Sequence, residues 1–168
     1  MSRIIPRFVA ALIATIIIAT SAPLSSVTAA EVEKRGEAFV VYLPGYLDYF
    51  EVFNRLQSEI HAANWEITNV QNIDTGMTQY GLNIKNKVIS ACKSQLLAKA
   101  IQEDPFISLA VPCRFTVFTD APNNRIVIGF ADPVAEAKAL GIQNYQAAGQ
   151  ATEELKGVLK TMAEFYGK

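Results

Sequence analysis

Two cysteines, Cys92 and Cys113, are the residues of this chain with the clearest potential for chemistry. A pair of thiols can form a disulfide, carry electrons or sulfur, or bind a soft metal ion such as Cu(I). Lys93 and Arg114 each follow a cysteine in the sequence, and their positive charges would stabilise a thiolate. The sequence contains no Cys-x-x-Cys, so it does not predict a thioredoxin-type site.

Three interpretations of the cysteine pair are open. Cys92 ends one predicted strand and Cys113 begins another, so the two ends meet if the strands are antiparallel neighbours; a disulfide needs Cα atoms within about 7 Å. That bond would close a loop of about 22 residues and stabilise the fold by about 3 kcal/mol. Alternatively, two free thiols are buried as small apolar groups. In the third interpretation the pair is reactive, because Cys92 precedes a predicted helix whose N-terminal dipole lowers a thiol pKa.

A group of aromatic residues forms the second candidate site. Such a group usually belongs to the core, and the alternative is a groove between helix and sheet that holds an apolar ligand. Its members are Tyr46, Tyr49, Phe50, Phe53 and Trp65.

Other chemistries have little support in the sequence. The chain has one histidine, His61, within a predicted helix, whereas a structural zinc site takes about four Cys or His ligands and a catalytic one about three. A Ser-His-Asp triad would have to use the same histidine. The sequence has no Gly-rich phosphate loop. We therefore expect no metal, no cofactor and no catalytic residue, which favours a non-enzymatic protein.

Residues 1–30 have the pattern of a secretion signal. A short basic segment precedes the uncharged apolar run from Phe8 to Thr20, which is shorter than the roughly 20 residues needed to span a bilayer as a helix. Small residues follow, so we expect cleavage near Ala29 or Ala30 and a periplasmic or secreted protein. An uncleaved anchor is the alternative. The mature part has no apolar run long enough to span a bilayer.

Composition limits the partners of the mature protein. The full chain has 15 basic and 16 acidic residues, and removal of the signal takes away Arg3 and Arg7 but no acid. A mildly acidic domain without a Lys/Arg cluster is a poor binder of nucleic acid, because phosphate contacts supply most of that affinity. We expect a small molecule or a protein as the partner. The alternatives are a thiol-based redox, sulfur-handling or soft-metal protein and a structural homo-oligomer, such as a homodimer.

Periodicity predicts a single α+β domain over residues 37–168, with helices on one face of a mainly antiparallel sheet. The charged segment 31–36 is expected to be a flexible leader, and Ser94 to cap a helix. Residues 120–124 have the chemistry of a hairpin turn. The predicted strands are 38–43, 66–73, 87–92, 114–118 and 125–130, and the predicted helices are 46–63, 95–102 (with Leu97, Ala100 and Ile101 buried), 134–140 and 145–165.

Short motifs in the centre of the chain carry a resemblance to a known family. Ala91-Cys92 ends a strand, Gln102-Glu103-Asp104-Pro105 ends a helix, and Val111-Pro112-Cys113-Arg114 begins the next strand. With Ala131-Asp132-Pro133, these motifs resemble the core of the domain of unknown function 302 family, over about residues 37–140. The resemblance implies a compact β-α-β(4)-α fold, similar in outline to TATA-binding-protein-like domains, and no established activity. The long C-terminal helix departs from the family pattern, and we expect it to cap the domain or to join two copies.

Overall fold

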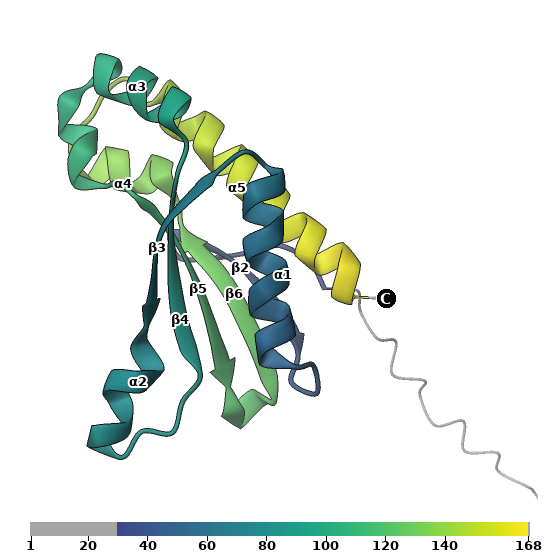
Figure 1. The fold of residues 1–168 in the computed structure, drawn as a ribbon. Helices are drawn as coiled ribbons and strands as arrows, with labels where there is room; N and C mark the ends of the chain where they lie inside the picture. Colours follow the sequence, from purple (N-terminus) through teal and green to yellow (C-terminus); the bar gives the residue numbers. More distant parts are fainter. Residues whose placement is uncertain (1–29, 168) are drawn as a thin grey trace, which may run out of the picture.

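The structure is a computed structural model that describes residues 30–167, so the secretion signal expected over residues 1–30 lies outside the described residues apart from Ala30. Within this range six antiparallel strands form one sheet, in the order β1-β2-β6-β5-β4-β3 (Figure 1). The strands are β1 (Glu33–Arg35), β2 (Ala38–Pro44), β3 (Glu66–Asn72), β4 (Asn86–Cys92), β5 (Cys113–Asp120) and β6 (Arg125–Ala131).

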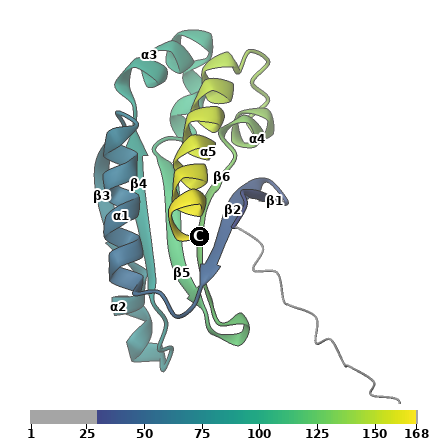
Figure 2. The same cartoon turned by 90° about the vertical axis from the view of Figure 1, so that its right-hand side faces the viewer.

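Two long helices, α1 and α5, lie side by side on one face of the sheet (Figure 2). Helices α3 and α4 lie beyond one end of the sheet, and α2 projects at the other end (Figure 1). In the described part of the chain, no helix is both long and apolar enough to cross a membrane. The helices are α1 (Tyr49–Ala62), α2 (Ile73–Met77), α3 (Ser94–Glu103), α4 (Pro133–Ala139) and α5 (Gln146–Tyr166), with short 3₁₀ turns η1 (Thr78–Tyr80), η2 (Pro105–Leu109) and η3 (Ala121–Asn123).

The predicted class, an α+β domain with helices on one face of an antiparallel sheet, is confirmed. Side chains alternate between the two faces of a strand, so every second residue of the central strands points to the helices. Val41 lies opposite Ile128, and both are fully buried against the helices. Leu155 and Met162 from α5 are fully buried in the same core. The main core therefore lies between the sheet and this pair of helices.

The opposite face of the sheet is left uncovered by the described helices (Figure 1). Val40 and Val127 are buried on this face although they belong to neither of the two apolar cores. Gly129 lies opposite Val40, and a Cβ there would come within 2.8 Å of the Phe39 carbonyl oxygen. The close packing of β2 on β6 therefore requires glycine at position 129.

A second, smaller core lies at the end of the sheet where α3, η2, α4 and the start of α5 meet. Four of its six buried residues are alanines, which bring the helices close together without large side chains between them. The six are Ala100, Ile107, Ala137, Ile142, Ala147 and Ala148.

The expectation of a flexible leader over residues 31–36 is wrong. Glu33–Arg35 pairs with β2 as an edge strand. Edge pairing uses backbone groups on one side only, so it needs no apolar side chain to hold it and leaves no alternating pattern in the sequence.

Two details of α3 also differ from the prediction. Ser94 is the first residue of the helix, and Lys93 holds the N-cap position without a side-chain hydrogen bond. Of the expected buried positions, Ala100 is buried but Ile101 is 41% exposed, and Leu96 is buried instead. The helix packs against α5 rather than against the sheet, which turns a different side inward.

The C-terminal helix caps its own domain. Its apolar stripe, which includes Val158 and Leu159, is buried against the sheet and α1. Phe165, near the end of the helix, is 47% exposed. A dimer joined through this stripe would have to remove the helix from its own core.

Candidate functional site

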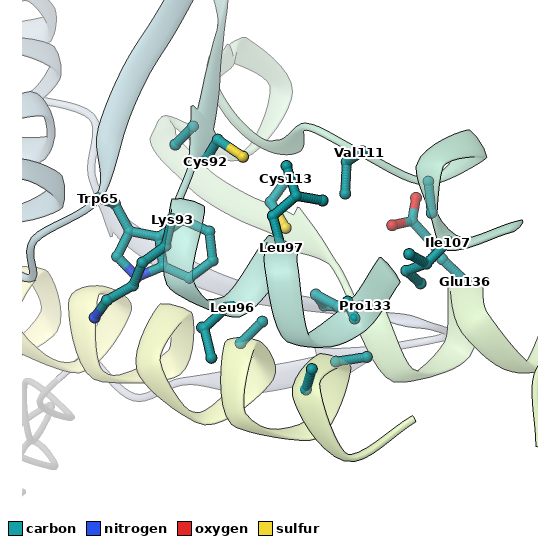
Figure 3. Close-up of a pocket in the computed structure, with 16 residues that line it drawn as sticks. Trp65, Cys92, Lys93, Leu96, Leu97, Ile107, Val111, Cys113, Pro133 and Glu136 are labelled. Atoms are coloured by element: carbon teal, nitrogen blue, oxygen red, sulfur yellow. The ribbon is translucent and has the colours of Figure 1, made fainter. Parts of the chain in front are cut away.

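An apolar pocket lies at the junction of the second core with the ends of β4 and β5 (Figure 3). Its walls come from α3, η2, α4 and α5, and its cavity volume is about 40 Å³. The alanines on α3 and α5 leave this space, because two short side chains face each other where larger ones would interdigitate. Its lining residues include Trp65, Cys92, Leu96, Leu97, Ala100, Ile107, Val111, Cys113, Pro133, Glu136, Ala147, Ala148 and Ala151.

Both cysteines line this pocket as free thiols. The prediction that the ends of their strands lie together is confirmed, since β4 and β5 are antiparallel neighbours. Cys113, however, lies opposite Ala91, one residue before Cys92. The two cysteines are therefore offset by one residue rather than directly paired, and Figure 3 shows both sulfur atoms beside the pocket without a bond between them. In this structure Cys92 and Cys113 are therefore two free thiols, without the bond of the first interpretation.

Cys113 is partly buried and packs against the main core. Burial, then the Glu136 carboxylate and then Cys92 raise its pKa to about 12, while Arg114 has a smaller opposite effect. A thiol with this pKa is protonated at neutral pH, and the protonated form is a poor nucleophile and a poor metal ligand. The surroundings of Cys113 favour a buried, unreactive thiol.

The two expected thiolate-supporting residues have other partners. The Lys93 ammonium group donates to Glu154 Oε2 at 2.7 Å and to the Ala63 carbonyl oxygen at 3.2 Å. The Arg114 side chain is 58% exposed, and its guanidinium lies 3.7 Å from Glu136. Lys93 is thus bonded elsewhere, and Arg114 lowers the pKa of Cys113 less than burial and Glu136 raise it.

Glu154 on α5 collects three donors and fixes one wall of the pocket. The Trp65 indole donates to its Oε2 at 3.0 Å, Lys93 to the same oxygen, and Gln150 to Oε1 at 3.1 Å. Burial alone raises the pKa of Glu154, but these hydrogen bonds outweigh that effect and hold the pKa below its usual value. The indole of Trp65, which is 3% exposed, is thereby locked in place beside the cavity.

The acidic residues of the central motifs act as helix caps around the pocket. Asp104 accepts a hydrogen bond from the Phe106 backbone N–H at 2.9 Å and begins η2. Asp132 does the same for α4. Glu103 accepts from the Ala147 N–H at 3.1 Å, which ties the end of α3 to the start of α5. These motifs therefore hold the elements of the pocket together.

Glu136 is the polar residue of the pocket that the sequence did not single out. It follows the capping Asp132 by four residues on α4 and lines the pocket near Val111. Burial and the negative charge of Asp132 raise its pKa, against the opposing effect of Arg114. No spacing rule marks it, because its importance depends on α4 lying beside β5.

The five aromatic residues of the second candidate site are not brought together as one groove. Tyr49 and Phe53 are buried in the main core, where the Tyr49 hydroxyl donates to the Val117 carbonyl oxygen at 2.9 Å. Tyr46 and Phe50 are exposed at the other end of α1 from Trp65. Trp65 alone among them lines the pocket. Within residues 30–167, no group of three or more His, Cys, Asp or Glu side chains is placed to hold a metal ion.

Comparisons with known proteins give a family and a fold. The sequence model described as "Domain of unknown function DUF302" matches residues 41–162. A crystal structure titled as an uncharacterized conserved protein DUF302 from Bacillus stearothermophilus is similar, with a TM-score of 0.64 and 13% identity over 79% of this chain and 99% of that one. No curated protein matches the chain. At this identity the structural likeness shows the fold alone.

Replacing Glu154 by glutamine should reduce stability more at pH 7 than at pH 3. Because folding lowers the pKa of Glu154 below its usual 4.5, its stabilising effect is fully present above that pH and is lost as the pH falls through the lowered value. We expect Glu154→Gln to lower the free energy of unfolding in urea by about 1–2 kcal/mol at pH 7. The control is Glu153→Gln, whose side chain is 71% exposed. An equal effect of Glu154→Gln at both pH values would contradict the three-donor arrangement.

Cys113 should resist alkylation in the folded, reduced protein. Its raised pKa leaves little thiolate at pH 8, so iodoacetamide should modify it at least about 100-fold more slowly than in the chain unfolded in urea. Mass spectrometry of the digested protein follows the Cys113 peptide separately from the Cys92 peptide. Similar rates in the folded and unfolded chains would show that the thiol is accessible and activated.

Proposed function

This chain belongs to the DUF302 family, whose function is unknown, and we propose that it is a non-enzymatic protein that binds a small apolar molecule in the pocket between Trp65 and α4. The observation that carries the proposal is the pocket itself. Its volume of about 40 Å³ is several times what one water molecule needs, roughly 10–15 Å³. Its lining is almost entirely hydrocarbon, which favours a small apolar ligand over water.

The polar groups around the pocket support binding rather than catalysis. Glu154, Trp65 and Lys93 satisfy one another, so their hydrogen-bonding capacity is used within the protein. Cys113 is held as a protonated thiol. A nucleophile needs a base or a cation that lowers its pKa, and the nearest carboxylate, that of Glu136, acts in the opposite direction.

The two alternative functions have less support. A thiol-based redox, sulfur-handling or soft-metal role would need Cys92 and Cys113 to act together as thiolates, and Lys93 is bonded elsewhere. A structural homodimer would need a surface other than the apolar stripe of α5, which is buried. Binding of a protein partner is less well supported than binding of a small molecule, because the pocket is suited to a small molecule.

The compartment is part of the same proposal. The pattern of residues 1–30 supports export, with cleavage near Ala29 or Ala30 and a periplasmic or secreted mature protein. A protein in that position would take up a small apolar molecule from outside the inner membrane.

Iodobenzene tests the proposal directly. Trp65 is the single tryptophan of the chain and lines the pocket, so a bound iodine atom would quench its fluorescence. We expect saturable quenching with a dissociation constant of about 1 mM or below, accompanied by a rise in melting temperature.

A pair of matched variants makes the test specific. Ala100→Met fills the pocket from α3 and should abolish saturable quenching, whereas Ala98→Met places the same side chain on the exposed side of the helix and should leave it unchanged. If Ala100→Met fails to fold, Ala148→Met on α5 replaces it. Quenching that does not saturate, or that survives the filled pocket, would contradict the proposal.

A further inference from the structure

The Glu136 carboxylate lies at the mouth of the apolar pocket and has one long polar contact. An ionised carboxylate accepts about four hydrogen bonds, yet within residues 30–167 its polar contact is the Arg114 guanidinium at 3.7 Å, too long for a hydrogen bond. Figure 3 shows the carboxylate directed from α4 into the space beside Val111 and Pro133. The side chain is 27% exposed, so a molecule seated in the pocket would cover it.

The charges around the pocket disfavour a second negative charge. Burial and the Glu136 carboxylate both act against ionisation of Cys113. The Asp132 carboxylate, one turn away on α4, acts in the same direction on Glu136. Lys93 also lines the pocket, but its ammonium group is directed away from it toward Glu154 (Figure 3).

Arg114 is the positively charged group that favours ionisation of Cys113 and Glu136. Its side chain is 58% exposed and is joined to Glu136 by a long contact, and exposed ion pairs of this kind contribute little. A ligand cation that excludes water would replace it, while the guanidinium turns to solvent at small cost. The pocket therefore combines a hydrocarbon interior with one negatively charged hydrogen-bond acceptor, Glu136, at its mouth.

We propose that the pocket selects small apolar molecules that carry an ammonium group, with the Glu136 carboxylate as the partner of that group. This inference rests on the proposed function and specifies its ligand class. The cavity volume of about 40 Å³ limits the buried apolar part to a short chain or one edge of a ring. The ammonium group donates charge-assisted hydrogen bonds to Glu136 while the apolar part fills the space between Trp65 and Leu97.

Benzylamine, toluene and phenylacetate distinguish the contribution of ligand charge to affinity from the contribution of the apolar ring. These probes share one ring and differ in charge, and their affinities follow from Trp65 fluorescence and from the shift in melting temperature of the purified protein. We expect Glu136→Gln to weaken benzylamine about tenfold and to leave toluene unchanged. Phenylacetate should bind the wild-type protein more weakly than toluene. Glu153→Gln, an exposed charge change outside the pocket, should alter none of the three.

The outcomes distinguish this inference from the proposed function. If toluene binds and benzylamine loses no affinity in Glu136→Gln, the ligand class is wrong and the pocket remains. If no probe binds saturably, both proposals fail. A pH titration gives an independent readout: protonation of Glu136, whose pKa is raised by burial, should weaken benzylamine as the pH falls but not toluene. A benzylamine affinity that does not change with pH would overturn the inference even if the variant fails to fold.

Discussion

The packing of α5 against two different cores is the constraint on which the rest of the structure depends. Its C-terminal half, with Leu155 and Met162, is buried on the sheet beside α1, and its N-terminal half, with Ala147 and Ala148, meets α3 and α4. Gly149 and Gly157 lower the intrinsic propensity of the helix, so tertiary packing has to hold it. Because one rigid element serves both cores, the small core and its pocket have a fixed position relative to the sheet.

Two carboxylates with different surroundings border the site on opposite sides. On one side Glu154 joins Trp65 to Lys93 and fixes the indole as a wall. On the other, Glu136 faces the cavity with a long contact to an exposed arginine. The two thiols lie between them, and burial together with the Glu136 carboxylate raises the pKa of Cys113 and keeps it protonated. This asymmetry favours reversible binding of an apolar, positively charged molecule over chemistry at sulfur.

Local patterns explain what the sequence predicts correctly and what it misses. The runs that form β5 and β6 and the turn between them are local signals, and the structure contains them. The contact of Trp65 with Glu154 spans 89 residues of sequence, so no short window reveals it. The sequence predicts that the ends of β4 and β5 meet, but not the register that places Cys113 opposite Ala91 and leaves both cysteines as free thiols. Glu136 lines the pocket because of where α4 lies in the fold, which no local sequence pattern reveals.

The most direct measurement is the anomalous scattering of iodine from a crystal of this protein soaked in iodobenzene. The account predicts one principal iodine peak inside the pocket, bounded by Trp65, Leu97 and Cys113, with the surrounding helices unchanged. A map with no iodine in the pocket, or with iodine at other surfaces only, would contradict the central claim that this cavity is a binding site.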